Sequence, residues 1–322
     1  MKPKVFIAQN VSKEVESYIG NYCDYKIWNS DEKIPKDILF KYVSEVDGLM
    51  QAGVKIDKEL LDASPNLKVV SNTAVGYDNF DLIEMKKRNI IGTNTPYVLD
   101  NTVADLVFAL ILSASRRIVE LDKFIRDGKW TKDIDKENFG LDVYNKTLGI
   151  IGMGRIGEKI AKRGKFGFDM DVIYFNRHRN LEMEEKLDIK YSTFDELLIK
   201  SDFIVIMTPL NEESKNLIDY REFNLMKKSA IFINASRGQT VNEAALIDAL
   251  ENKKIYAAGL DVFYTEPINK DNPLLKMKNV VLSPHIGSAT VKTRDEMAMM
   301  AAKNMVSALI GEPVPNIVKE LK

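Results

Sequence analysis

Three side chains that could work together in one reaction follow three apolar segments in the second half of the chain. Arg237 comes after residues 230–234, Glu266 after 257–261 and His285 after 280–283. A guanidinium can hold a carboxylate, and an imidazole can give a proton to a carbonyl oxygen. A carboxylate beside the imidazole fixes its tautomer and favours its protonated form. The set therefore suits the reduction of a carbonyl that neighbours a carboxylate. Taken singly, each residue is more often a surface charge or a structural residue, so the inference rests on the three together.

The pattern around these residues is typical of a parallel α/β protein. Short β-branched segments alternate with helical patterns along the whole chain. Strands are expected near 5–8, 25–28, 48–50, 67–71 and 90–92, and again near 147–151, 171–175, 203–207, 230–234, 257–261 and 280–283. Because the carboxyl ends of parallel strands meet at one edge of a sheet, the three chemical groups should come together there.

The length and the helical patterns indicate two domains. A chain of 322 residues is too long for one ordinary hydrophobic core. A helix expected over 102–116 is apolar nearly all round, which predicts burial between larger bodies. A polar, irregular stretch covers 126–145, and a last helix is expected over 288–310, ending at Gly311.

A glycine-rich motif marks the expected cofactor site. The strand 147–151 runs into Gly152-Met-Gly154-Arg155-Ile156-Gly157, and a helical pattern follows. This strand-turn-helix context is typical of dinucleotide binding, because the glycines permit a tight turn, close approach of a pyrophosphate and close packing of the helix. Backbone N–H groups at the helix start, including those of Arg155 and Ile156, favour an anion.

The next strand bears on the choice of nucleotide. It ends in Asn176-Arg177-His178-Arg179, where an NAD-selective protein usually has a carboxylate for the ribose 2′-hydroxyl. Two guanidiniums are available there for a 2′-phosphate. The sequence therefore predicts that NADP(H) is preferred and that NAD(H) can also be used. The alternative interpretation is a solvated basic turn.

The composition limits the other functional classes. The 46 basic and 47 acidic residues leave a net charge of −1, so the sequence predicts no binding to nucleic acid. We expect no membrane segment, because the most apolar stretch, 103–112, is too short to span a bilayer. Cys23 is the only cysteine, which fits a reducing, cytoplasmic location and a buried structural role.

Four motifs together resemble one enzyme family. GMGRIG, INASRG, GLDVFYTEP and SPHIGSAT occur in this order, as in the D-isomer-specific 2-hydroxyacid dehydrogenases. The resemblance covers essentially the whole chain. It is closest to the glyoxylate/hydroxypyruvate reductase branch, through SNTAVGYDNFD at 71–81, TVADL, SRR at 115–117 and HIGSAT at 285–290.

The resemblance implies two doubly wound parallel-sheet α/β domains and roles for particular residues. A flavodoxin-like substrate domain would comprise 1–99 and 287–322, and a Rossmann dinucleotide-binding domain 100–286. His285 resembles the acid/base, Glu266 its carboxylate partner and Arg237 the residue that holds the substrate. Backbone at Val75 and Gly76 would receive the substrate carboxylate, and Ala52 and Gly53 would leave room for its side chain. The cofactor would also contact Thr102, Thr208, Pro209, Ala235, Asp261 and Gly287.

The implied reaction reduces glyoxylate or hydroxypyruvate to the D-2-hydroxy acid. Pyruvate, 2-ketogluconate or another 2-oxo acid remains an alternative substrate. A dinucleotide-sensing binding protein without catalysis is an alternative of a different class, although Arg237, Glu266 and His285 are all present. The family also implies a homodimer formed through the dinucleotide-binding domains, with the 102–116 helix and the 115–145 arm, including Trp130, as candidate contacts.

Overall fold

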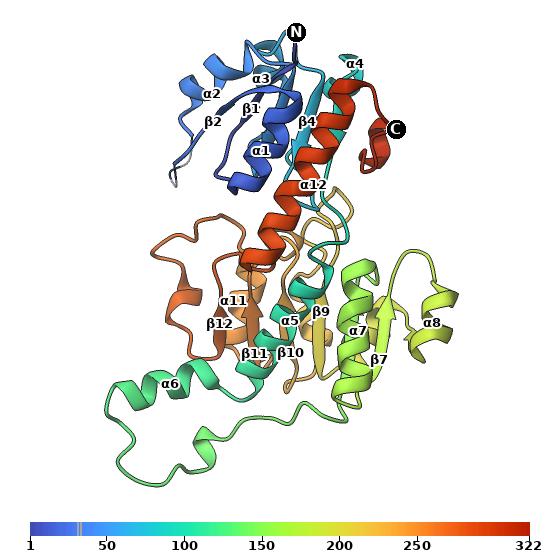
Figure 1. Cartoon of the computed structure of the whole chain (residues 1–322). Coiled ribbons are helices and arrows are strands. Elements are labelled where there is room, and N and C mark those ends of the chain that lie inside the picture. The colour runs from blue at the N-terminus through green and yellow to red at the C-terminus, as the bar shows by residue number, and fades with distance from the viewer. Residues whose placement is uncertain (31, 33) are drawn as a thin grey trace. The chain divides into compact units, whose positions relative to one another are not determined.

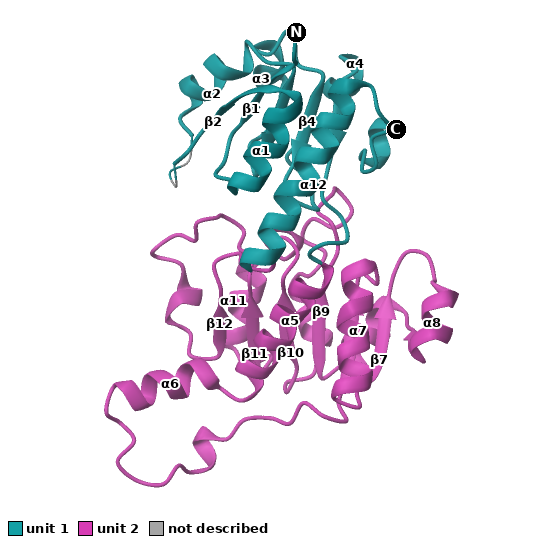
Figure 2. Ribbon diagram, in the orientation of Figure 1, with its two compact units in different colours: residues 1–99, 289–322 teal, residues 100–288 magenta. Residues whose placement is uncertain are grey.

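The computed structural model describes residues 1–30, 32 and 34–322 and divides them into two compact units. Unit 1 contains residues 1–99 and 289–322, and unit 2 contains residues 100–288 (Figure 2). The chain therefore leaves unit 1 after Leu99 and returns to it at Ala289.

Unit 1 is built on a parallel sheet of five strands in the order β2-β1-β3-β4-β5. The strands are β1 Lys4–Ile7, β2 Asp24–Ile27, β3 Gly48–Gln51, β4 Val69–Asn72 and β5 Ile91–Thr93. The helices are α1 Lys13–Tyr22, α2 Lys36–Val43, α3 Lys58–Asp62, α4 Leu82–Lys87 and α12 Val291–Ile310, with a short turn η4 Lys319–Leu321. This is the strand order of flavodoxin-like domains.

Side chains along the strands of unit 1 alternate between the two faces of the sheet, so the unit has a hydrophobic core on each face. Phe6 and Leu49 face the side that is covered by α2, α3 and α4, whereas Val5 and Met50 face α1 and α12. Helix α12 lies along the sheet (Figure 1), and the hydroxyl of Ser71 on β4 donates to the carbonyl of Ala301 on α12 at 2.7 Å. The C-terminal helix is thus an integral layer of unit 1.

Unit 2 is built on a parallel sheet of seven strands in the order β12-β11-β10-β9-β6-β7-β8. The strands are β6 Thr147–Ile151, β7 Asp171–Phe175, β8 Lys190–Tyr191, β9 Phe203–Ile206, β10 Ile231–Asn234, β11 Ala257–Leu260 and β12 Val280–Leu282. The helices are α5 Asp100–Ser115, α6 Ile118–Arg126, α7 Arg155–Gly167, α8 Leu181–Leu187, α9 Phe194–Lys200, α10 Tyr220–Leu225 and α11 Glu243–Glu251, with short turns η1 Lys136–Asn138, η2 Gly238–Thr240 and η3 Pro273–Lys276.

Both faces of this second sheet are covered. Leu148, Ile150 and Val205 are fully buried against the α5 and α7 side, and Ile204 and Phe232 against the α9, α10 and α11 side. Fully burying one such side chain contributes roughly 1.5–3 kcal/mol. The prediction of two doubly wound parallel α/β sheets is confirmed.

The helices depart from expectation in a few places. Helix α5 is not buried all round, because Asp105, Ala109 and Leu112 form an exposed line along it. Its other side packs on α7, β10 and β11, which is enough to hold an apolar helix. Helix α6 and the edge strand β8, which spans only two residues, were not expected from the sequence. Helix α12 begins at Val291 rather than at 288, because Thr290 caps it by accepting a hydrogen bond from the N–H of Thr293.

Strand order in unit 2 locates the edge where a ligand would bind. Strand β6 lies between β7 and β9, so the loops after β6 and β9 leave the sheet toward opposite faces at this point. Crevices of this kind, at the carboxyl ends of parallel strands, are where α/β sheets bind ligands.

Two further observations bear on expectations from the composition. Within the described residues, no helix is long and apolar enough to cross a membrane. Burial raises the pKa of the Cys23 thiol to about 11, so the thiol stays protonated at neutral pH.

Candidate active site

The glycine-rich loop is packed so closely at Gly152 and Gly157 that a side chain at either position would clash. Gly152 has a φ of +103°, and a Cβ there would lie 2.7 Å from the carbonyl carbon and oxygen of Met207. A Cβ on Gly157 would lie 2.6 Å from the carbonyl oxygen of Gly152. A Cβ on Gly154 would meet nothing within 4 Å. The loop is therefore packed on one side and open at Gly154, directly before α7.

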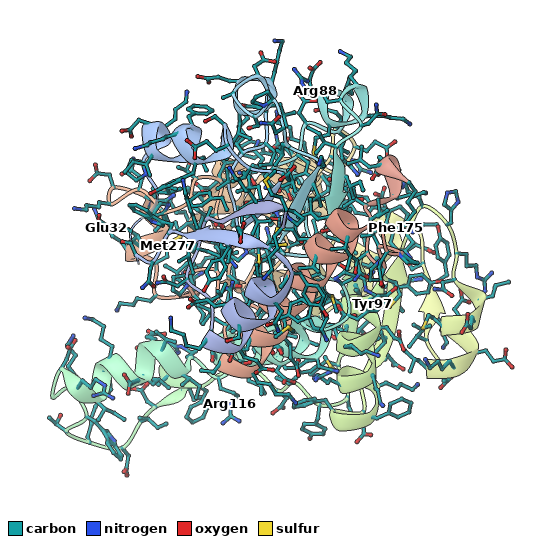
Figure 3. The ribbon with its side chains drawn as sticks, turned by 45° about the horizontal axis from the view of Figure 1, so that its top comes forward. Glu32, Arg88, Tyr97, Arg116, Phe175 and Met277 are labelled. Carbon is teal, nitrogen blue, oxygen red and sulfur yellow. The ribbon has the colours of Figure 1, made fainter. Side chains whose placement is uncertain are left out.

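Asn176 fastens the end of β7 to this loop. Its side-chain oxygen accepts a hydrogen bond from the N–H of Met153 at 2.7 Å, and its amide nitrogen donates to the carbonyl of Met153 at 3.1 Å. Strand β7 ends one residue earlier at Phe175, which is labelled in Figure 3. Asn176 thus fixes where the following basic turn begins relative to the glycine-rich loop.

The two arginines of the basic turn are already engaged with carboxylates. Arg177 pairs with Glu213, which lies in the loop after β9. Arg179 makes two hydrogen bonds with Glu184 on α8, of 2.7 and 2.6 Å. His178 lies between them and is exposed. These partners were not predicted from the sequence. Glu213 is brought in from the loop after β9, and Glu184, five residues after Arg179, is placed beside it by the turn into α8.

Four other expected cofactor contacts lie around the same crevice. Thr208 and Pro209 lie in the loop after β9, Ala235 follows β10, and Thr102 lies in the first turn of α5. The hydroxyl oxygen of Thr208 is buried, and within the described residues it has no hydrogen-bond partner. A buried polar atom without a partner costs free energy, so a site for a polar ligand atom is a physical explanation.

Asp100 and Arg155 form an ion pair beside the start of α7. The Nε of Arg155 lies 3.3 Å from a carboxylate oxygen of Asp100, which is buried. Burial raises the pKa of Asp100, and the positive charge of Arg155 only partly opposes this shift. The pair holds the arginine near the open glycine. Together with the loop and Thr208, this arrangement fits a dinucleotide.

A second cluster lies at the ends of β11 and β12. His285 has a left-handed backbone, with φ +52°, and its N–H donates to the carbonyls of Asp261 and Ser283. The imidazole Nδ1 lies 2.7 Å from Oε2 of Glu266. The two side chains come from loops 19 residues apart. The fold thus brings together two of the three residues singled out for catalysis.

Glu266 is held by more than the imidazole. Its Oε1 accepts a hydrogen bond from the N–H of Phe263 at 3.0 Å. Burial alone would raise the pKa of Glu266, but the hydrogen bonds from His285 and Phe263 and the charge of Arg237 outweigh it and lower that pKa. The carboxylate is therefore ionised at neutral pH.

Arg237 comes from the neighbouring loop after β10 and is close enough to act on the charge of Glu266. Its guanidinium donates to the carbonyl of Ser236 at 2.9 Å. The next residue, Gly238, packs directly on the loop after β11, because a Cβ there would lie 1.9 Å from the carbonyl carbon of Phe263. This contact sets the loop of the arginine against the loop of the glutamate.

Asp261 is fully buried and braces the histidine loop. Its carboxylate accepts hydrogen bonds from the hydroxyl of Ser283 at 2.6 Å and from the N–H groups of Ile286 and Gly287, both at 2.8 Å. The residues on both sides of His285 are therefore tied to Asp261. A contact between Asp261 and a cofactor stays a prediction.

The residues expected to receive a substrate in unit 1 lie at one edge of its sheet. Ala52 and Gly53 follow β3, and Val75 and Gly76 follow the adjacent β4. Three buried or half-buried amides shape these loops. Gln51 donates to Asn72 at 2.9 Å, Asn72 donates to the carbonyl of Gly76 at 2.7 Å, and Asn94 donates to the carbonyl of Val75 at 2.8 Å.

Several of these supporting residues were not predicted from the sequence. Gln51 and Asn72 each end a fully buried strand, and an amide at the end of such a strand is a signal that can be read from sequence. Glu213 could not have been found in this way, because it is one of many exposed carboxylates and only the fold pairs it with Arg177.

The sequence of this chain is similar to those of known dehydrogenases and reductases. Residues 108–287 match the family model described as D-isomer specific 2-hydroxyacid dehydrogenase, NAD binding domain. A glyoxylate reductase from Pyrococcus horikoshii is 45% identical over 99% of this chain and 96% of its own length. A probable 2-ketogluconate reductase from Dictyostelium discoideum is 46% identical over 87% of this chain and 84% of its own length.

A solved structure of a reductase is similar in fold to this chain. The NADPH-dependent glyoxylate/hydroxypyruvate reductase from Sinorhizobium meliloti, crystallised in complex with NADP and malonate, superposes with a TM-score of 0.86. It is 29% identical, and the match covers 100% of this chain and 98% of that one.

Proposed function

Because the chain belongs to the D-isomer specific 2-hydroxyacid dehydrogenase family, we propose that it reduces glyoxylate or hydroxypyruvate to the corresponding D-2-hydroxy acid. The observation that carries this proposal is the 2.7 Å contact between Nδ1 of His285 and Oε2 of Glu266. With Nδ1 engaged, Nε2 is the nitrogen that can give a proton to the substrate oxygen.

Each residue of the cluster then has one task. His285 protonates the keto oxygen in reduction and accepts the proton back in oxidation. Glu266 is ionised and stabilises the imidazolium before the proton is transferred. Arg237 holds the carboxylate and the carbonyl oxygen of the substrate with its planar fork of donors. Backbone at Val75 and Gly76 receives the carboxylate, and Ala52 and Gly53 leave room for the substrate side chain.

We propose that unit 2 binds the nicotinamide dinucleotide, which supplies the hydride when bound, and that unit 1 is the substrate domain. The glycine-rich loop, with Arg155 and Ile156 at the start of α7, would hold the pyrophosphate. Arg177, with His178 and Arg179 beside it, would lie near the adenosine ribose, so NADP(H) is preferred over NAD(H). Thr102, Thr208, Pro209, Ala235, Asp261 and Gly287 would line the rest of the cofactor.

The test is the rate of nicotinamide oxidation by the purified protein, measured by absorbance with glyoxylate and with hydroxypyruvate. Each substrate is run with NADPH and with NADH in parallel. Fast turnover with NADPH supports the reaction and the cofactor preference together. Turnover with NADH alone would keep the reaction and contradict the preference. No turnover with any combination would contradict the proposed substrates.

A second substrate is favoured by one specific observation, the relative named as a probable 2-ketogluconate reductase. Because Ala52 and Gly53 carry little or no side chain, that edge of unit 1 does not exclude a longer acid by bulk. The same assay with 2-ketogluconate separates the two candidates. A kcat/KM for 2-ketogluconate above that for glyoxylate would make the larger acid the better assignment.

We also propose that the protein is a homodimer formed through unit 2. Helix α6 and residues 127–145 extend away from the seven-stranded sheet (Figure 1) and carry exposed apolar side chains. These are Ile118, Val119, Ile125, Trp130, Ile134, Phe139 and Tyr144. The exposed line of α5, which includes Leu112, precedes this arm in the chain. A second copy of the chain is an occupant that would cover both, because apolar surface of this extent is unusual on a monomer.

A further inference from the structure

The two ion pairs of the basic turn differ in how firmly each arginine is held. Arg179 is fixed by two hydrogen bonds to Glu184, whose side chain is only 12% exposed. Glu184 also accepts a hydrogen bond from the buried Tyr174 at 2.8 Å, and the hydroxyl of Tyr174 accepts one from the N–H of Asn180 at 2.7 Å. Arg179 thus belongs to a hydrogen-bond network that holds α8 against β7. Releasing Arg179 would break two bonds of this network.

Arg177 is held far less firmly. It makes one hydrogen bond to Glu213, and the two side chains are 70% and 68% exposed. An exposed ion pair with a single contact contributes little to stability and exchanges its partner readily. Of the two guanidiniums, Arg177 is therefore the one that a ligand can recruit.

The backbones on both sides of this pair are nevertheless fixed. Arg177 follows Asn176, which is bonded twice to Met153. Glu213 lies in a closed turn, where the side-chain oxygen of Asn211 accepts hydrogen bonds from the N–H groups of Glu213 at 3.0 Å and Ser214 at 2.9 Å. The hydroxyl of Ser214 closes the turn by donating to the carbonyl of Pro209 at 2.6 Å. The carboxylate of Glu213 is therefore presented beside Arg177 by the fold.

We propose that Glu213 is a specificity-determining residue, which competes with the 2′-phosphate of NADP(H) for Arg177 and so weakens the preference for NADP(H) over NAD(H). The inference rests on the proposed function, in which this turn lies near the adenosine ribose. A 2′-phosphate must displace Glu213 from the guanidinium and then tolerate its negative charge nearby. A 2′-hydroxyl carries no charge, so NAD(H) binds with the Arg177–Glu213 pair intact.

Removal of this one charge should strengthen the binding of NADP selectively. In Glu213→Gln, we expect the ratio of the dissociation constants of NAD and NADP to rise about threefold to tenfold. Glu212→Gln is the matched control, because it removes the same charge from the neighbouring exposed position of the same turn. Exposed charges are screened by salt, so the effect should shrink at high ionic strength.

The experiment is isothermal titration calorimetry of oxidised NADP and NAD on the full chain. The variants are Glu213→Gln, Glu212→Gln, Arg177→Gln and the double variant Arg177→Gln/Glu213→Gln. The expected result is a rise of the ratio in Glu213→Gln alone, which becomes smaller when Arg177 is also replaced. Binding equilibria are measured directly, so the result does not depend on turnover.

Two other results would overturn the inference in different ways. If the wild type prefers NADP and Glu213→Gln changes the ratio no more than Glu212→Gln does, the role of Glu213 is refuted while the proposed preference stands. If the wild type does not prefer NADP and neither Arg177→Gln nor Glu213→Gln alters the ratio, the basic turn does not lie at the 2′-position. In that case both the proposed cofactor preference and the role of Glu213 are refuted.

Discussion

The imidazole of His285 and the carboxylate of Glu266 form a hydrogen-bonded pair, with Nδ1 and Oε2 2.7 Å apart, although the two residues belong to different loops. The left-handed backbone at His285 and the bonds of Asp261 to Ile286 and Gly287 fix one loop. The N–H of Phe263 fixes the carboxylate on the other. The pair is therefore assembled in the folded chain, ready to orient a proton.

Replacing His285 by Ala should remove the proton donor and leave the cofactor site intact. General acid catalysis by one positioned group contributes about 10²–10⁴-fold, so kcat should fall by that factor. The measurement is the steady-state rate with hydroxypyruvate, together with calorimetry of NADP binding. An unchanged kcat would show that another group donates the proton, and weakened NADP binding would show that the substitution disturbs more than the donor.

Replacing Glu266 by Gln should lower kcat on the order of 10²-fold, because the imidazolium loses its anionic partner. The same change should affect stability in a pH-dependent manner. The pKa of Glu266 is lowered in the folded chain, so its ionised form stabilises the fold above the ordinary pKa of a glutamate, about 4.3. This contribution is lost as the pH falls through the lowered pKa.

Urea unfolding of the wild type and Glu266→Gln at several pH values tests the direction of this pKa shift. The wild type should be the more stable protein at neutral pH, and the difference should close toward strongly acidic pH. The carboxylate is partly exposed, which makes the difference small. A difference that widens as the pH falls would contradict the direction of the shift.

The two arginines of the basic turn should not be equivalent. Arg177→Gln should raise the KM for NADPH about tenfold and leave the KM for NADH within about twofold, since it removes a charge-assisted contact. Arg179→Gln should instead lower the melting temperature, because it breaks the network with Glu184 and Tyr174. The cofactor KM values and thermal unfolding of both variants are the measurements. Equal effects on the KM for NADPH would refute the distinction.

Two glycines allow a comparison of stability with cofactor binding. A Cβ at Gly238 would lie 1.9 Å from the carbonyl carbon of Phe263, so Gly238→Ala should destabilise the fold by about 1–3 kcal/mol or more. A Cβ at Gly154 meets nothing within 4 Å, so Gly154→Ala should change stability by less than about 1 kcal/mol. Gly154→Ala should nonetheless weaken dinucleotide binding, because the open side of the loop would receive the pyrophosphate. Normal NADP affinity in Gly154→Ala would refute that assignment.

Local pattern was enough to predict much of the fold and the position of the candidate site. Buried strands such as Thr147–Ile151 are continuous apolar segments, and the residues after them are placed by the parallel arrangement alone. The partners of Arg177 and Arg179 could not be predicted from local pattern. Glu213 comes from the loop after β9, and Glu184 is placed beside Arg179 by the turn that leads into α8. The exposed line on α5 was also missed, because an apolar helix gives no sign of which side lacks a neighbour.

The arm of unit 2, which consists of α6 and residues 127–145, should determine the oligomeric state of the protein. It is shaped by Arg117, which pairs with Glu120 and donates to the carbonyl of Glu137, and by the N–H of Leu141, which donates to the carbonyl of Ser115 at 2.8 Å. Arg116, labelled in Figure 3, lies directly before Arg117 in the chain. This internal bonding gives the arm a defined conformation while its apolar side chains stay exposed.

A charge placed on that apolar surface should therefore separate the proposed dimer. Ile125→Glu introduces a carboxylate on α6, where the side chain is 54% exposed. Ile199→Glu on α9 is the matched control, because that isoleucine is 51% exposed and lies outside the arm. Light scattering at micromolar concentration should give a dimer for the wild type and Ile199→Glu, and a monomer for Ile125→Glu, since an unpaired charge is costly to bury in an interface. A monomeric wild type would refute the dimer, and a dimeric Ile125→Glu would place the interface elsewhere.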